Sequence, residues 1–412
     1  MIDLAKLAAV LALIVLLLRL RWNLGLVLVL AAAATALLFG TQDLAFLAVE
    51  SLQAVIDPLT LRLVAIVLLI TFLGEILRAT LQLEGLVRSL GDLFADRRWL
   101  LALMPMLIGM LPMVGGAMFS APMVDEASHE IEVSHERRTF LNYWFRHTWE
   151  PVFPLYPSLV LAAGLMGVSV QALTVSQWPL FVAALAGGAL FGLAGIGPAR
   201  SPHDGQSGLH DGTPPNRRET LRLLLHSIWP ILLVLVLSVA LHVDLIASLL
   251  ITIALLIVTQ RLGPAKLWVL ARGMPFGTVP IIVGAMIFRR MLEAAGAIEA
   301  VSGSLAALGI PLVVVVFAVP MVAGLLTGLL AAAFAIGLPI VLPLLGVDPI
   351  ASGYGLVAYA GGFAGLMLSP LHLCLALTRV YFKAEWGGVY RRLVPAVLLL
   401  VIAAAITFWL GQ

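Results

Sequence analysis

The sequence predicts an all-α integral-membrane protein with about ten transmembrane helices, two re-entrant helical hairpins and an internal repeat of inverted topology. Composition is the first observation: 62% of the 412 residues are hydrophobic and only 11% are charged, whereas soluble domains carry about 25% charged residues. The second is that apolar segments long enough to cross ~30 Å of hydrocarbon recur along the chain. The third is that the second half repeats the order of elements found in the first. We therefore expect lipid to solvate much of the protein.

Ten apolar segments are long enough to serve as membrane spans. The first is interpreted as a retained span rather than a signal peptide, because Asp3 precedes Lys6 and no small-residue cleavage site follows. The expected spans lie at about 4–20, 24–40, 60–78, 140–168, 178–197, 223–242, 244–260, 274–292, 350–382 and 393–411. The chain accordingly divides into N-terminal spans at 1–59, a first repeat at 60–197, a polar cytoplasmic linker at 198–222, connecting spans at 223–273 and a second repeat at 274–412.

Two further apolar stretches, 99–124 and 308–345, are interrupted at their centres by Gly/Pro-rich GMLPMVGG (109–116) and by GLLTG (324–328). Each flank is about 10–16 residues, which at about 1.5 Å per residue is too short or too marginal for a crossing. A break in mid-stretch is typical of a hairpin that enters the membrane and leaves on the same side.

The distribution of positive charge favours this topology. With the N-terminus outside and both hairpins re-entrant, all but four of the 24 Lys and Arg residues lie inside. The four exceptions are Lys6, Arg62, Arg289 and Arg290. If either hairpin crossed the membrane, the bias would largely collapse. We therefore expect a multi-pass protein of a bacterial or archaeal cytoplasmic membrane, with both termini outside.

The two halves match in the order span, amphipathic stretch, interrupted hairpin and long broken span, at offsets of about 211–217 residues. Five crossings separate the starts of the repeats, near 60 and 274, so the repeats face opposite ways. The long third elements are 140–170, broken by three prolines, and 350–382, broken around Gly361-Gly362, Gly365 and Ser369-Pro370. Inverted repeats with paired hairpins are the architecture of alternating-access carriers. The alternative is proline kinks that merely shape helix packing.

Composition also excludes several classes of function. The net charge is +2 and the basic residues form no basic arm, so no nucleic-acid partner is expected. One cysteine, Cys374, excludes an intrachain disulfide and a cysteine-based zinc site, and we expect it to be a small packing residue. Neither a metal nor a cofactor is expected. No phosphate-binding Gly-x-x-x-x-Gly-Lys-Ser/Thr loop occurs, which argues against an ATP-driven pump.

Two hairpin tips and two broken spans that converge near the midplane would form a polar pocket. Half-helix N-termini carry partial positive charge and attract anions. The candidate substrate-binding residues are Gly115, Gly116, Ser120, Thr327, Gly328, Ser369 and His372. The alternative for the small hairpin residues is that they allow close helix packing. The alternative for His372 is that it is a buried histidine whose hydrogen bonds are made within the protein.

Arg146, His147 and Glu150 are the candidate proton-coupling residues, because they lie within about one helical turn next to Pro151. Ionisable groups at membrane depth are functional candidates. The alternative is an Arg146–Glu150 i,i+4 pair at the cytoplasmic interface. The preceding residues 142–144 (Asn-Tyr-Trp) are expected at the membrane interface, as part of an aromatic belt.

The segment GMLPMVGGAMFSAPMVDEA (109–127), followed by FRHTWEPVFPLYPS (145–158), resembles an uncharacterised prokaryotic membrane family within the ion-transporter superfamily. That superfamily includes gluconate permeases, citrate and dicarboxylate carriers and sodium/proton antiporters. The resemblance covers nearly the whole chain. It implies about ten spans, two re-entrant hairpins, a scaffold with a moving transport unit, a homodimer and small anionic substrates.

The resulting hypothesis is a proton-coupled secondary carrier of a small organic anion, such as a carboxylate or sugar acid, and not an enzyme. A cation/proton antiporter is an alternative, but it would predict acidic residues at both broken spans, and the second has none. A membrane-embedded enzyme is a further alternative. It would need a nucleophile, base or metal set, and no His-Glu-x-x-His, Gly-x-Ser-x-Gly or paired membrane aspartates occur.

Overall fold

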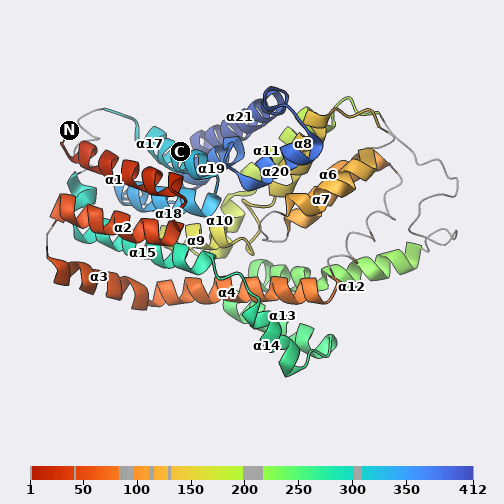
Figure 1. The fold of residues 1–412 in the computed structure, drawn as a ribbon, viewed down its shortest axis with the longest axis horizontal. Helices are drawn as coiled ribbons and strands as arrows, with labels where there is room; N and C mark the ends of the chain where they lie inside the picture. Colours follow the sequence, from red (N-terminus) through yellow and green to blue (C-terminus); the bar gives the residue numbers. More distant parts are fainter. Residues whose placement is uncertain are drawn as a thin grey trace.

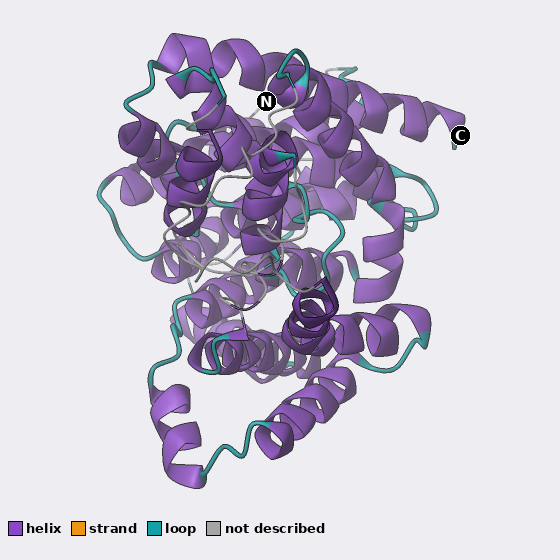
Figure 2. Ribbon diagram, turned by 90° about the vertical axis from the view of Figure 1, so that its right-hand side faces the viewer, coloured by secondary structure: helices purple, strands orange, loops and turns teal. Residues whose placement is uncertain are grey.

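The computed structural model describes residues 2–40, 43–82, 85, 89, 96–110, 116–128, 131–197, 217–300 and 309–411. Over these residues the protein consists of helices and loops, with no strand element (Figures 1 and 2). The all-α prediction is therefore confirmed.

The first half contributes ten described helices and two π-helical extensions. They are α1 (Ile2–Arg19), α2 (Leu24–Thr35) with its extension Ala36–Gly40, α3 (Leu44–Ile56), α4 (Pro58–Ala79), α6 (Arg97–Gly109), α7 (Ala117–Ser128), α8 (His135–His147), α9 (Pro157–Met166), α10 (Val170–Ser176) and α11 (Trp178–Gly188) with its extension Ala189–Leu193. Local sequence sets several starts. The Asp57 side chain caps α4 by accepting a hydrogen bond from the Leu59 amide. Pro58 is the first residue of α4, where a proline is tolerated because the amide at that position has no partner within the helix.

The second half contributes nine described helices. They are α12 (Arg217–Leu235) with a π-helical extension Val236–Ala240, α13 (Leu245–Thr259), α14 (Pro264–Arg272), α15 (Thr278–Ala294), α17 (Leu312–Thr327), α18 (Leu330–Val341) followed by a 3₁₀ turn Leu342–Leu344, α19 (Tyr354–Leu368), α20 (Leu373–Phe382) and α21 (Trp386–Leu410).

Four helical segments among the described residues are long and apolar enough to cross a membrane. They are Pro58–Ala79, Arg218–Ala240, Tyr354–Phe382 and Trp386–Leu410. A fifth results if α9 and α10, bent by 104° at their junction, are counted as one span. Seven shorter apolar segments of 10–17 residues accompany them. These segments suit a membrane protein, because lipid can cover their apolar surfaces.

Most helices run roughly along the long axis of the molecule (Figure 1). α2 packs against α1 and α15, and α3 packs against the other side of α15. Nearly every residue of α9, α18 and α19 is buried, so these three helices form the centre of the described fold. By contrast, α14 has no buried residue and protrudes from the body in both views.

The second broken element differs from the prediction. α19 runs without interruption through Gly361, Gly362 and Gly365, and the only break is Ser369–His372. A Cβ atom on Gly361 or Gly365 would lie 2.1 Å from a backbone carbonyl oxygen of α17. These glycines therefore permit close packing of two helices rather than breaking one.

Three further differences are local. α17 continues past Gly324 to Thr327, and the hairpin turns at Gly328, which has φ +67°. Residues 217–222, predicted to end the linker, form the first turns of α12, whereas 198–216 lie outside the described residues. α3 and α14 occupy stretches where the sequence predicts no span.

Candidate functional site

Two breaks in the helices meet at the centre of the fold. α8 ends at His147 and α9 begins at Pro157, while α19 ends at Leu368 and α20 begins at Leu373. The ring centroids of His147 and His372, one from each break, are 4.9 Å apart. The hairpin formed by α6 and α7 and the hairpin formed by α17 and α18 each contact one of these breaks. The site is therefore built from residues that are far apart in sequence.

Arg146 lies in the last turn of α8 and is only 3% exposed. A Cβ atom on Gly116, at the tip of the first hairpin, would lie 2.4 Å from Arg146 Nη2. A Cβ on Gly109 would lie 2.2 Å from the Arg146 carbonyl oxygen. The Tyr156 hydroxyl donates a hydrogen bond to the Gly109 carbonyl and also hydrogen-bonds the Arg146 guanidinium. Glycine at both hairpin positions therefore lets the hairpin close directly over a buried cation.

His147 is 1% exposed, and its Nδ1 lies 2.6 Å from the Tyr143 carbonyl oxygen. Because a carbonyl only accepts, Nδ1 carries the proton of this hydrogen bond, and Nε2 of the neutral ring presents its lone pair. Nε2 is 3.9 Å from Glu150 Oε1. The ring orientation is thus fixed by its own helix, and its second nitrogen faces the break.

Glu150 lies in the turn after α8 and is buried. Its backbone carbonyl accepts a hydrogen bond of 2.7 Å from the Tyr359 hydroxyl of α19. Its Oε2 atom has no hydrogen-bond partner among the described residues. α8 ends at His147, so Arg146 and Glu150 do not lie four residues apart on one helix, and both side chains are buried. The two groups still interact electrostatically.

His372 precedes the first residue of α20 and is buried. A Cβ on Gly328, at the tip of the second hairpin, would lie 2.7 Å from the His372 amide nitrogen. The Ser369 hydroxyl donates to the Leu325 carbonyl of α17 at 2.7 Å. The second hairpin therefore lies directly on the second break, as the first hairpin lies on the end of α8.

Among the described residues, the hydroxyls of Ser120 and Thr327 bond to backbone carbonyls of their own helices rather than to this cluster. The Ser120 hydroxyl bonds the Ala117 carbonyl in its own helix at 3.3 Å. The Thr327 hydroxyl bonds the Ala323 carbonyl at 2.8 Å, and Thr327 lines an apolar crevice of about 240 Å³ beside α1. Gly115 lies outside the described residues.

The aromatic-belt prediction for residues 142–144 is wrong, because all three side chains are buried. The Asn142 amide donates to the Ala117 carbonyl at 2.9 Å, and Trp144 Nε1 donates to the Ala184 carbonyl at 2.7 Å. The Tyr143 ring packs on His147, with 4.7 Å between centroids. One sequence signal was available: Tyr143 lies four residues before His147 and so shares its helix face.

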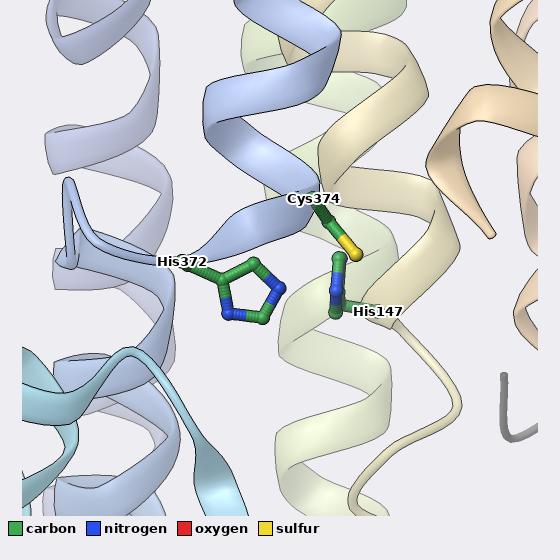
Figure 3. Close-up of side chains that lie close together, drawn as sticks. All are labelled: His147, His372 and Cys374. Atoms are coloured by element: carbon green, nitrogen blue, oxygen red, sulfur yellow. The ribbon is translucent and has the colours of Figure 1, made fainter. Parts of the chain in front are cut away.

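Cys374 lies beside the two histidines, whereas the sequence predicts it to be a packing residue and no part of a zinc site. The Cys374 sulfur and one ring nitrogen from each of His147 and His372 all lie within 4.8 Å of one another. Figure 3 shows a nitrogen of His372 turned toward His147 and the sulfur. These three side chains have the donor types that bind a transition metal.

Comparison with known proteins assigns a family but no activity. A search of proteins with curated function finds no match. A family model described as "Protein of unknown function (DUF401)" matches residues 3–410, which supports the resemblance to an uncharacterised family. Because that match extends over nearly all of the sequence, the chain belongs to the DUF401 family.

Proposed function

We propose that this protein is a secondary carrier of a small organic anion, such as a carboxylate or a sugar acid, that works by alternating access in a membrane. The observation that carries this proposal is Arg146. Its guanidinium is buried at the tip of one hairpin, beside the break at which the two halves of the chain meet. A buried cation at such a position is expensive to maintain and marks a functional site.

The pattern of helix packing supports the inverted repeat on which the carrier depends. The helices α1–α4 and α6–α9 correspond in order to α12–α15 and α17–α20. α2 packs against α15, and its counterpart α13 packs against α4. Likewise, α3 packs against α15 as α14 packs against α4, and α9 packs against α18 as α20 packs against α7. Such reciprocal contacts are expected of two halves related by a pseudo-two-fold axis.

The chemistry of the breaks favours an anion as the solute. α20 begins next to His372, and α7 begins next to Gly116 and the guanidinium of Arg146. The N-terminal ends of helices carry partial positive charge, and an arginine can bind a carboxylate through two parallel hydrogen bonds. These groups favour a small carboxylate as the solute, in addition to the electrostatic interaction that Arg146 makes with Glu150.

The details of the carrier model come from the sequence. We include in the proposal about ten membrane spans, two re-entrant hairpins, a homodimer, and both termini outside the cytoplasmic membrane. Proton coupling through Glu150, His147 and Arg146 stays a prediction.

The test is uptake by proteoliposomes that contain the purified protein, across a panel of monocarboxylates, dicarboxylates and sugar acids. The variants Arg146→Gln and Arg146→Lys are compared with Arg289→Gln, which removes an arginine from a partly exposed ion pair with Glu293. Losing a hydrogen bond to a charged group costs about 1.5–3 kcal/mol, so we expect uptake at low solute concentration to fall roughly 10- to 100-fold. The Arg289 variant should transport normally.

Two results would reject the proposal. One is a folded wild-type protein that moves no anion of the panel. The other is a folded Arg146→Gln protein with unchanged uptake. The same assay with and without a pH gradient tests the prediction of proton coupling.

A further inference from the structure

The structure brings together two imidazoles and one thiol from separate breaks of the chain. His147 ends α8, His372 precedes α20, and Cys374 lies in the first turn of α20. All three are buried, and their ligand atoms lie within 4.8 Å of one another. We propose that His147, His372 and Cys374 bind one borderline-soft transition-metal ion such as Zn²⁺.

The geometry is close to that of a metal-bound set. Zinc bonds of about 2.0–2.1 Å to histidine nitrogen and 2.3 Å to thiolate sulfur place the ligand atoms of a tetrahedral His–His–Cys set roughly 3.3–3.6 Å apart. A separation of up to 4.8 Å therefore needs about 1–1.5 Å of closure, which side-chain rotation can supply. Two imidazoles and a thiolate favour zinc, copper or cobalt over magnesium or calcium, which prefer oxygen ligands.

The surroundings of His147 orient it as metal-binding histidines are commonly oriented. Its Nδ1–H donates to the Tyr143 carbonyl oxygen at 2.6 Å, which leaves the Nε2 lone pair for a metal. A backbone carbonyl that fixes the second ring nitrogen is a common outer partner of metal-bound histidine. The edge-to-face packing of His147 on His372 explains why the rings touch, but it does not explain a sulfur atom beside their nitrogens.

Glu150 is the candidate for a fourth ligand, a role that excludes the proton-coupling role predicted for it from the sequence. Its Oε1 lies 3.9 Å from His147 Nε2, about 0.5 Å more than two nitrogen or oxygen ligands of one zinc ion require. Its Oε2 lacks a hydrogen-bond partner among the described residues. A divalent ion with one thiolate and one carboxylate carries no net charge, and a neutral unit is the least costly to bury.

The experiment uses the purified full chain in detergent, with the tag removed and the thiol kept reduced. Zn²⁺ affinity is measured by competition with a chromophoric chelator, and Co²⁺ serves as a spectroscopic probe. We expect one Zn²⁺ per chain and a higher Tm when it is present. We also expect a Co²⁺ spectrum with tetrahedral d–d bands and a thiolate-to-metal charge-transfer band.

The variants locate the site. Cys374→Ser should abolish the charge-transfer band and weaken Zn²⁺ binding at least tenfold, and His372→Gln should weaken Zn²⁺ binding similarly. His226→Gln, at an exposed histidine of α12, should leave affinity and spectrum unchanged. Glu150→Gln should lower Zn²⁺ affinity if its carboxylate is the fourth ligand, and an unchanged affinity overturns that assignment alone.

A well-folded wild-type protein that binds less than one-tenth of an equivalent of Zn²⁺ would overturn the proposal. So would Co²⁺ binding without a charge-transfer band, or Zn²⁺ affinity unaffected by Cys374→Ser. If Cys374→Ser fails to fold, the Co²⁺ spectrum of the wild type decides alone, because Cys374 is the only cysteine of the chain. None of these readouts depends on transport, so failure here leaves the carrier proposal standing.

Discussion

A single methyl group at the tip of the first hairpin should displace the buried arginine. In Gly116→Ala, the new Cβ would lie 2.4 Å from Arg146 Nη2, 2.7 Å from Nε and 2.9 Å from Cζ. Non-bonded carbon and nitrogen atoms pack at roughly 3.5 Å, so the guanidinium must move by about 1 Å. A shift of that size would break a charge-assisted hydrogen bond between the guanidinium and the carboxylate of the solute, and such a bond is worth about 1.5–3 kcal/mol. We therefore expect anion uptake at low solute concentration to fall roughly 10- to 100-fold.

The assay combines uptake with thermal unfolding, so that loss of binding is separated from loss of fold. The guanidinium is the end of a flexible side chain, so Gly116→Ala should lower Tm only slightly. Gly109→Ala places its Cβ 2.2 Å from the Arg146 carbonyl, which is backbone, and should instead lower Tm strongly. Gly74→Ala, in α4 with no atom within 4 Å of the added Cβ, is the matched control. Gly116→Ala with normal uptake would refute the reasoning.

Three further perturbations follow. Gly365→Ala places its Cβ 2.1 Å from a carbonyl of α17 and should destabilise the protein by about 1–3 kcal/mol through overpacking; an unchanged Tm would show that the two helices can separate freely. Tyr359→Phe removes the hydroxyl that donates to the Glu150 carbonyl and should destabilise the protein by about 1 kcal/mol in the same measurement; an unchanged Tm would contradict this. Glu136 lies outside the membrane spans. Hydrogen bonds from the Glu136 backbone amide and from the Glu385 amide lower the pKa of the Glu136 carboxyl group, although partial burial opposes them. A carboxyl group with a lowered pKa stabilises the folded protein above its unfolded pKa, and this stabilisation is lost as the pH falls through the folded pKa. Glu136→Gln should therefore reduce Tm at neutral pH and not in acid; an equal loss of Tm at both pH values would contradict this.

The features that could be read from the sequence are those with a local cause. The composition and the length of the apolar runs predict an all-helical membrane protein, because lipid permits little else. The three prolines between 151 and 157 predict the break after α8, because proline removes a backbone donor. Glu75 and Arg78, three residues apart on α4, form an ion pair, because residues with that spacing are neighbours on a helix surface.

What the sequence could not predict depends on contacts between distant residues. Glycine inside an apolar helix either breaks the helix or allows a neighbour to approach, and only the carbonyls of α17 show that Gly361 serves the second purpose. Tyr143 and Trp144 have the composition of an interfacial belt, yet both are buried and donate hydrogen bonds to backbone carbonyls. No spacing pattern in the sequence predicts that the rings of His147 and His372 pack against each other.

The inverted orientation of the two hairpins can be measured by labelling with a membrane-impermeant thiol reagent. Single cysteines at Trp99, Glu126, Ile310 and Val347, which are exposed positions beside the ends of the two hairpins, are introduced into a Cys374→Ser background. The inverted-repeat carrier predicts that the first two react only from the cytoplasmic face and the last two only from the opposite face. Reaction of the two ends of either hairpin from opposite faces would contradict it, because that hairpin would then cross the bilayer.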